Sequence, residues 1–166
     1  MTIPADQKTQ RRLAAVLAAD VVGFSALMGQ DEEGTLARIK DLRREVLEPK
    51  VDDHQGRVVK TTGDGILVEF SSPVEAVRCA TKIQQCLAAT GSREPPKTLQ
   101  LRIGINLGDI IIEADGDIYG DGVNVAARLE QMAEPGGLCV SGFWIGTSLK
   151  LVNKGKAGIW ADPPKK

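Results

Sequence analysis

The chain of 166 residues is poor in cysteine and histidine, with three cysteines and one histidine. An odd number of cysteines cannot pair completely, and no two of them have the spacing of a metal-binding set. Cys79, Cys86 and Cys139 are therefore predicted to be buried, reduced thiols. A single histidine cannot build a histidine-rich zinc site, and the position of His54 shortly before Gly56 favours the protein surface.

Long apolar runs and an excess of one charge are absent as well. No run approaches the roughly 20 apolar residues that a membrane-spanning helix needs. The N-terminal sequence MTIPADQKTQRR lacks the apolar segment of a signal peptide. The formal net charge is −1, so the chain has no overall basic field to attract nucleic acid. These absences predict a cytoplasmic protein without a membrane span and without a nucleic-acid partner.

The residues that are present fit one globular domain. The length allows a single domain with its own core and is too short for two comfortable ones. Hydrophobic residues make up 42% of the chain and charged residues 26%, which are the ordinary proportions of a soluble globular protein. Residues 1–11 are polar and are predicted to form a flexible N-terminal tail.

The first half of the domain is predicted to contain a strand, a helix and a β-hairpin. The apolar run Leu13–Ala19 favours a strand covered on both faces, although its alanines leave a buried helix open. Asp31 is predicted to cap a helix whose apolar residues recur at helical spacing, and Pro49 to end or kink it. The hairpin is predicted at Val58–Phe70, where two apolar runs flank the turn sequence TTGDG.

The second half is predicted to contain a helix, a second hairpin, a third helix and a short strand. Ser72–Glu75 has the capping box of a helix start. Apolar residues alternate over Leu99–Leu107, and Gly108-Asp109 is predicted to turn this strand back. A helix over residues 122–133 and a short run at Leu138–Val140 follow. This order predicts an α+β fold with a ferredoxin-like βαββαβ core and additional C-terminal elements, its helices packed on one face of an antiparallel sheet.

Two aspartates at strand ends form a candidate metal site. Asp20 ends the first predicted strand and Asp64 lies between two glycines at the hairpin tip, and these strands are neighbours in a ferredoxin-like sheet. Two carboxylates with coordination positions left open suit Mg²⁺, which usually binds together with nucleotide phosphates. The turn Val21–Ser25 would add backbone N–H groups for those phosphates. Two unrelated turn aspartates are the alternative that the local pattern leaves open.

Two further pairs of side chains suit a nucleotide. Asn124 and Arg128 are four residues apart on the third helix, so they share a face where arginine would stabilise a polyphosphate. An ordinary solvated helix face is the alternative. Lys60 and Asp117 offer a donor and an acceptor that match the ring nitrogen and exocyclic amine of adenine, whereas guanine reverses the pattern. An edge-strand lysine and a turn aspartate are the alternative there.

Three segments together resemble a known family. ADVVGFS at 19–25, GRVVKTTGDGILVEF at 56–70 and DIYGDGVNVAARLE at 117–130 resemble, in order and spacing, the signature segments of the class III nucleotidyl cyclase catalytic domain. The resemblance covers residues 12–142, which are taken as the cyclase catalytic domain. It implies a ferredoxin-like core with extra elements, and a head-to-tail homodimer with its active sites at the interface.

The resemblance implies a metal and phosphate role for five residues. Asp20 and Asp64 would bind two Mg²⁺ or Mn²⁺ ions per active site, and the carbonyl of Val21 would be a further ligand. The backbone amides of Gly23 and Phe24 would face the phosphates.

The resemblance also implies a role for the two other pairs. Lys60 and Asp117 match the adenine-selecting pair of the family. Asn124 and Arg128 match the pair that orients the ribose and stabilises the phosphoryl charge. In the family the metal aspartates come from one subunit and these four residues from its partner, so one chain would hold two half-sites.

The resemblance ends at about residue 142. The segment 143–166 is atypical and shortened, and it does not restore the family's phosphate-contacting lysine; Lys150, Lys154 and Lys156 are candidates for a substitute. The function predicted from these observations is an adenylate cyclase, a phosphorus–oxygen lyase that converts ATP to 3′,5′-cyclic AMP and pyrophosphate. The alternatives are a catalytically silent dimerisation or nucleotide-binding module, and a guanylate cyclase.

Overall fold

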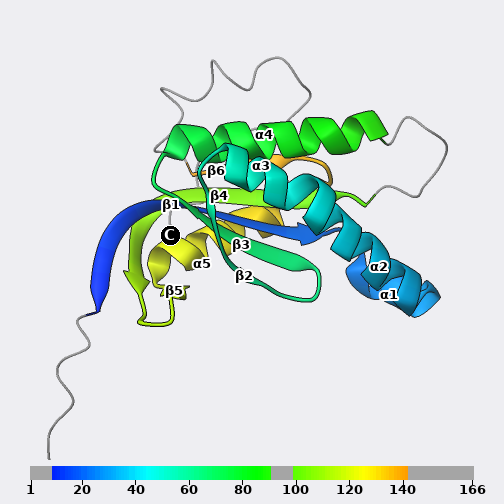
Figure 1. Ribbon diagram of the computed structural model, residues 1–166, viewed down its shortest axis with the longest axis horizontal. Coiled ribbons are helices and arrows are strands. Elements are labelled where there is room, and N and C mark those ends of the chain that lie inside the picture. The colour runs from blue at the N-terminus through cyan, green and yellow to red at the C-terminus, as the bar shows by residue number, and fades with distance from the viewer. Residues whose placement is uncertain (1–8, 91–98, 142–166) are drawn as a thin grey trace, which may run out of the picture.

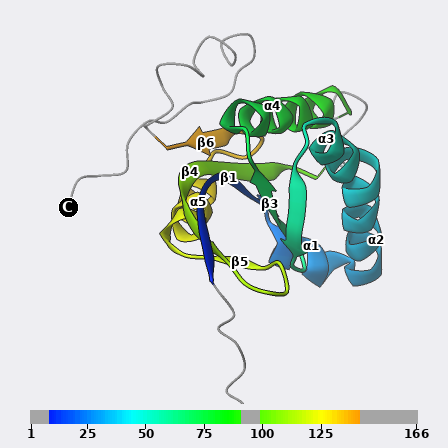
Figure 2. The same cartoon turned by 60° about the vertical axis from the view of Figure 1, so that its left-hand side comes forward.

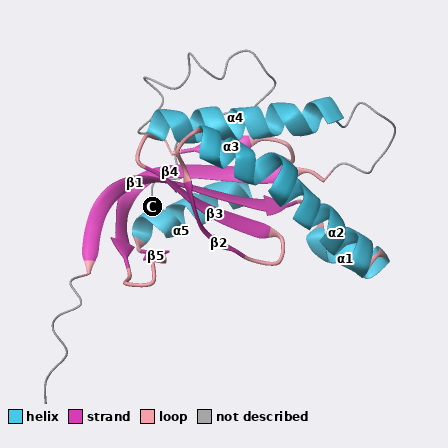
Figure 3. Cartoon of the chain, viewed as in Figure 1, coloured by secondary structure: helices cyan, strands magenta, loops and turns pink. Residues whose placement is uncertain are grey.

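The computed structural model describes residues 9–90 and 99–141 (Figure 1). Figure 3 distinguishes the helices from the strands. Their order is β1 (Gln10–Val21), α1 (Phe24–Gln30), α2 (Glu32–Leu42), the π-turn η1 (Arg43–Leu47), α3 (Glu48–Asp53), β2 (Arg57–Thr61), β3 (Gly65–Phe70), α4 (Pro73–Thr90), β4 (Leu101–Ile112), β5 (Ile118–Tyr119), α5 (Asp121–Met132) and β6 (Leu138–Val140). The segment 143–166, with Lys150, Lys154 and Lys156, lies outside the described residues.

The strands form one curled sheet with the order β2-β3-β1-β4-β5, and β6 runs parallel to the first half of β4. The other neighbours pair antiparallel. The order β2-β3-β1-β4, with α1–α3 and α4 as the two crossovers, is the ferredoxin-like βαββαβ arrangement. The predicted fold class is thus confirmed. Strand β1 begins at Gln10, two residues inside the segment expected to be a tail.

Helices cover both faces of the sheet, so the expectation that they pack on one face was wrong. Side chains of β1 alternate between the faces. Leu17 and its odd-numbered neighbours belong to the core under α2, α3 and α4, whereas Val16 and its even-numbered neighbours belong to the core that includes Ala126 of α5. Figure 2 shows α4 and α5 on opposite sides of β4. The continuous apolar run at Leu13–Ala19 is explained by this double cover.

Strand β4 is continuous, so the turn expected at Gly108-Asp109 was also wrong. Gly108 and Asp109 lie opposite Ala14 and Leu13 of β1 in the middle of the ladder. A Cβ at Gly108 would lie 2.8 Å from the Cα of Gly122 in α5. The glycine therefore permits close contact between strand and helix instead of forming a turn. The chain reverses later, where Gly116 N–H donates to the carbonyl of Glu113 at 2.9 Å.

The predicted cap of the second helix is confirmed, and the helical path continues beyond Pro49. The side chain of Asp31 accepts a hydrogen bond from Gly34 N–H at 2.9 Å. After Leu42 the helix widens into the π-turn and then resumes as α3 as far as Asp53. Pro49 lies in the first turn of α3, where its missing N–H does not interrupt the helix.

The single histidine is buried, contrary to expectation. His54 follows α3 with 6% of its surface exposed, and its Nδ1 lies 2.5 Å from Oε2 of Glu75 on α4. The packing of α3 against α4 encloses it, which the nearby glycine does not reveal. All three cysteines are free, as predicted; Cys79 and Cys139 are buried and Cys86 is half-buried. Within residues 9–90 and 99–141, no helix combines the length and apolar character needed to cross a bilayer.

Candidate nucleotide and metal site

Asp20 and Asp64 are brought to the same end of the sheet. Asp20 lies opposite Gly65 at the end of the β1–β3 ladder, and Asp64 is the residue directly before Gly65. The N–H of Val21 donates to the carbonyl of Asp64 at 3.2 Å, which joins the end of β1 to the hairpin tip. Both aspartate side chains are half-buried. The register of the sheet therefore produces the juxtaposition that the sequence predicted.

A third carboxylate, Glu130 of α5, lies beside this pair and was missed by the sequence prediction. Glu130 is only 8% exposed. Burial, a hydrogen bond with the Asp20 side chain and the negative charges of Asp20 and Asp64 raise the pKa of Glu130 to about 8. The signal in the sequence is its place on the buried face of α5, with Ala126 and Leu129. The surroundings of Glu130 thus disfavour a third negative charge beside Asp20 and Asp64.

The donor set fits a divalent cation. Oδ1 of Asp20 and Oε1 of Glu130 are buried, and neither has a hydrogen-bond partner within the described part of the chain. An orphaned carboxylate oxygen in an acidic cluster is costly unless a cation compensates it. No three Asp, Glu, His or Cys side chains among residues 9–90 and 99–141 form a complete metal-binding group. Asp20 and Asp64 would thus leave positions on a hard cation for substrate oxygens.

The turn after β1 lies against the hairpin tip. Gly23 has a φ of 68°, in the left-handed region that favours glycine, and it precedes the first residue of α1, Phe24. No side chain caps this helix start, so its first amides are open to another acceptor. A Cβ on Gly63 would lie 3.5 Å from the ring of Phe24, so the ring packs under the tip. Gly23 and Phe24 thus border the two aspartates.

Lys60 and Asp117 form a direct pair across the curled sheet. Nζ of Lys60 lies 3.0 Å from both carboxylate oxygens of Asp117 and 5.3 Å from the centre of the Tyr119 ring. Burial alone would raise the pKa of Asp117. Hydrogen bonds from Lys60, the Ile118 N–H and Tyr119 outweigh burial and lower it. The structure therefore joins the two residues that the sequence pairs as a base reader.

Asn124 and Arg128 are not joined to the aspartates of the same chain. Both side chains are exposed on α5, while Glu130 on the same helix is buried beside Asp20. Within the described residues, neither Asn124 nor Arg128 has a hydrogen bond or ion pair with Asp20 or Asp64. One chain thus presents the aspartates and the exposed Asn–Arg pair as separate groups.

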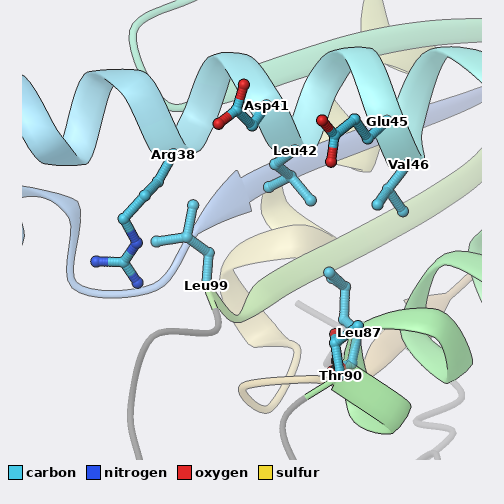
Figure 4. Close-up of a pocket in the computed structure, with 8 residues that line it drawn as sticks. All are labelled: Arg38, Asp41, Leu42, Glu45, Val46, Leu87, Thr90 and Leu99. Atoms are coloured by element: carbon cyan, nitrogen blue, oxygen red, sulfur yellow. Dashed lines mark hydrogen bonds between the residues drawn. The ribbon is translucent and has the colours of Figure 1, made fainter. Parts of the chain in front are cut away.

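A cavity of about 250 Å³ lies elsewhere, between the α2 helix region and the end of α4 (Figure 4). Asp41 and Glu45 line it from one side, and Leu87 and Thr90 of α4 from the other. It contains none of the residues predicted to bind the nucleotide or the metal.

Three further polar residues hold the site's elements, and the sequence analysis did not identify them. Asn106 Nδ2 donates to the Gly122 carbonyl at 3.1 Å and fixes the start of α5 on β4. Gln84 Nε2 donates to the carbonyls of Leu101 and Gly137 at 3.0 and 2.8 Å. Arg43 contacts the carbonyls of the hairpin tip. A single polar residue on a helix or strand carries no local pattern, so only the fold reveals these roles.

Comparison with known proteins places the fold and these segments in one family. The model of the "Adenylate and Guanylate cyclase catalytic domain" matches residues 7–152. "Putative adenylate cyclase 3" of Rhizobium meliloti (strain 1021) is 54% identical over 138 residues, 82% of this chain and 23% of that protein. An "Adenylate cyclase" of Streptomyces coelicolor is 30% identical over 128 residues, 77% of this chain and 32% of that protein.

A solved structure agrees with these relatives. The "Adenylate/Guanylate Cyclase/Hydrolase from Silicibacter pomeroyi" is 46% identical, with a TM-score of 0.81, and the match covers 89% of this chain and 86% of that one. The chain spans only about a quarter to a third of the two curated relatives. Since the family model matches most of the chain, the chain belongs to the adenylate and guanylate cyclase catalytic domain family.

Proposed function

We propose that the chain is an adenylate cyclase catalytic domain that converts ATP to 3′,5′-cyclic AMP and pyrophosphate as a homodimer. The observation that carries the choice of ATP is the contact of Lys60 with Asp117 at 3.0 Å. This pair offers adenine a donor for a ring nitrogen and an acceptor for the 6-amino group. A guanylate cyclase would need the opposite pattern of donor and acceptor.

Asp20 and Asp64, with the Val21 carbonyl, would hold two Mg²⁺ or Mn²⁺ ions. When bound, such ions polarise phosphate oxygens and lower the pKa of a sugar hydroxyl. The amides of Gly23 and Phe24 bind the phosphates beside them. The acidic cluster with its orphaned Asp20 oxygen supports this assignment.

The reaction is an in-line displacement at the α-phosphorus. The ribose 3′-oxygen loses its proton and forms a bond to the α-phosphorus, while the bond from that phosphorus to the bridging oxygen breaks and pyrophosphate leaves. Asn124 orients the ribose. Arg128 stabilises the negative charge that develops on the phosphoryl oxygens.

A second copy of the chain completes the site. The aspartates lie at the end of β1 and the hairpin, whereas Asn124 and Arg128 are exposed on α5 and have no contact with them in the described part of one chain. A head-to-tail dimer would bring the α5 face of one copy to the aspartates of the other. Each dimer would then contain two complete sites.

Cyclic nucleotide production tests the proposal. Purified protein is incubated with ATP or GTP and Mg²⁺ or Mn²⁺ over a range of protein concentrations. We expect cyclic AMP from ATP, little cyclic GMP, and a specific activity that rises with protein concentration. A protein that makes neither product in any condition is the silent module, and a preference for GTP identifies a guanylate cyclase.

Arg128 is the sharpest single test of the phosphoryl role. Replacement by alanine should lower kcat by about 10²–10³, the usual scale for loss of one charge-stabilising donor. The exposed Gln131→Ala on the same helix is the control and should retain activity. Unchanged kcat in Arg128→Ala would remove this residue from the mechanism.

A further inference from the structure

We propose that Arg43 is a positioning residue for the reaction: its guanidinium fixes the hairpin tip and thereby sets the place of Asp64. The inference rests on the metal role proposed for Asp64. It starts from one nitrogen, Nη2 of Arg43, which donates to the carbonyl of Thr62 and lies 3.2 Å from the carbonyls of Gly63 and Gly65. The contacted carbonyls lie on both sides of Asp64.

The tip is bonded to β1 through the Val21 N–H, which donates to the Asp64 carbonyl at 3.2 Å, and Arg43 restrains it from a second side. Two of its residues, Gly63 and Gly65, flank Asp64, and glycine has the widest choice of backbone conformation. The turn has its own bonds, from Thr62 N–H to the Gly65 carbonyl at 2.9 Å and from Gly65 N–H to the Thr62 hydroxyl at 3.1 Å. Arg43 adds a charged donor that comes from a different element. A charge-assisted hydrogen bond is stronger than a neutral one.

The helix is built so that Arg43 can reach the tip. Buried side chains of the helical segment occur at Ile39, Leu42, Leu47 and Val51. Leu42 and Leu47 are five residues apart, whereas residues on one face of an α-helix are three or four apart. The π-turn Arg43–Leu47, in which Glu48 N–H bonds to the Arg43 carbonyl, accommodates the extra residue and keeps both leucines on the buried face. Both halves of the helix therefore bury their apolar face. Arg43 begins the wider turn, beside the hairpin.

The neighbouring arginine provides a matched control. Arg44 is exposed, and its guanidinium bonds to Asp41 at 2.8 Å and Glu45 at 3.1 Å on the solvent side of the same turn. It has no contact with the hairpin among the described residues. Arg43→Met and Arg44→Met thus remove the same charge from adjacent positions, and only the first removes the tip contacts.

Hydrogen–deuterium exchange tests the contact without relying on activity. In Arg43→Met, the amides of Thr62 and Gly65, which donate the hydrogen bonds within the turn, should exchange on the order of 10-fold faster than in the wild type, with α4 unchanged. Arg44→Met should leave the tip unchanged, and Arg43→Lys should give an intermediate rate. Equal tip protection in Arg43→Met and the wild type overturns the proposal, as does faster exchange spread over the whole domain.

Metal dependence tests the positioning of Asp64. Arg43→Met should raise the Mn²⁺ concentration for half-maximal activity by about 10-fold and lower kcat, while the ATP/GTP ratio of kcat/KM stays constant because Lys60 and Asp117 are untouched. An active wild type with equal Mn²⁺ dependence in Arg43→Met and Arg44→Met overturns the inference. An inactive wild type instead contradicts the proposed function, and the exchange experiment still decides whether Arg43 restrains the tip.

Discussion

Lys60 is held between a carboxylate and an aromatic ring before any base binds. The Lys60 ammonium group donates to the carboxylate of Asp117, whose two oxygens each lie 3.0 Å from Nζ, and it also lies over the Tyr119 ring. Its position is therefore fixed by two neighbours from the β4–β5 region. In the base-reading role proposed for it, a lysine that is already oriented would lose less side-chain freedom on binding than an unrestrained one.

Reversing the charge of Lys60 should weaken the preference for adenine. In Lys60→Glu, a carboxylate replaces the only donor of the pair and faces Asp117, so the ATP/GTP ratio of kcat/KM should fall by about 10-fold or more, the scale of one lost hydrogen bond to a charged group. Lys82→Glu, an exposed change on α4, is the control. If the ratio in Lys60→Glu matches that of the control, Lys60 does not read the base.

At the scale of the elements, α5 lies unusually close to β4 at Gly104. A Cβ at this position would lie 2.2 Å from the N of Glu130 and 2.3 Å from the carbonyl oxygen of Ala126. Both atoms belong to the helix backbone, which cannot move alone. The helix that carries Asn124, Arg128 and Glu130 is therefore seated directly on the strand.

Gly104→Ala should displace α5. We expect a loss of about 1–3 kcal/mol in the free energy of unfolding, the usual cost of overpacking, together with reduced cyclase activity. Gly29→Ala is the matched control, because Gly29 is exposed in α1 with nothing within 4 Å of the added methyl group. Urea denaturation measures the free energy of unfolding of both variants, and cyclic nucleotide production measures their activity. A Gly104→Ala protein as stable as the control would contradict the close packing of α5.

The contact between His54 and Glu75 joins α3 to α4 and makes stability depend on acid pH. The hydrogen bond with His54, and then that with Arg78, lowers the pKa of Glu75. A depressed carboxylate pKa favours the folded state above the ordinary pKa of about 4.3, and this contribution is lost as the pH falls through the lowered value.

Glu75→Gln should therefore lower Tm at pH 7, and the difference between the two proteins should shrink as the pH falls through the lowered pKa of Glu75 and the carboxylate takes up its proton in the folded state as well. Thermal unfolding followed by circular dichroism across this range measures the difference. The control is Glu134→Gln, a change at an exposed position, whose Tm should equal that of the wild type at every pH. A Tm difference for Glu75→Gln that stays the same as the pH is lowered would show a packing effect instead of a charge effect.

The sequence predicted the elements whose signal is local. The alternation of β4, the cap at Asp31 and the glycines around Asp64 each depend on a few adjacent residues, and these predictions of structure held. The turn predicted at Gly108-Asp109 was wrong because a glycine in a strand is compatible both with a turn and with close contact to a helix. Only the position of α5 shows that the second applies. His54, Arg43 and Glu130 are likewise defined by partners 19 or more residues away in the chain, such as Glu75 and Gly65.

The roles in catalysis come from the family resemblance and stay predictions. The register of β1 with β3 brings Asp20 to Asp64, and the curl of the sheet brings Lys60 to Asp117. The residues and the expected topology proposed both pairings, with unrelated turn aspartates, or an edge-strand lysine and a turn aspartate, as the alternatives. The resemblance to three ordered segments decided between these interpretations, because a family motif records contacts that a single local pattern does not.

At the scale of the whole molecule, two inactive variants should restore activity when mixed. Asp20→Asn removes a carboxylate proposed to bind the metal, and Arg128→Ala removes the side chain proposed to stabilise the phosphoryl group. Half of the dimers formed from an equal mixture contain one of each, and each such dimer has one intact site of two, so we expect about a quarter of the wild-type specific activity. A mixture that stays inactive contradicts a site shared between copies.

Asp20→Asn mixed with Asp64→Asn is the control for this experiment. Both changes damage the same half of the site, so no combination of the two chains contains an intact pair of aspartates. This mixture should remain inactive at every ratio. Activity in this mixture would indicate contaminating wild-type protein. Gel filtration of each mixture checks that dimers form.

The curl of the sheet also has a consequence for the order of folding. The bond from Arg57 to the Gly116 carbonyl and the bond from Lys60 to Asp117 join residues 59 and 57 positions apart. Such distant contacts repay the entropy of loop closure only after the strands between them have formed. We therefore expect β2 and the β4–β5 turn to meet late. Newly made chains would pass through an open sheet that already holds Asp20 beside Asp64 but cannot yet bind a base.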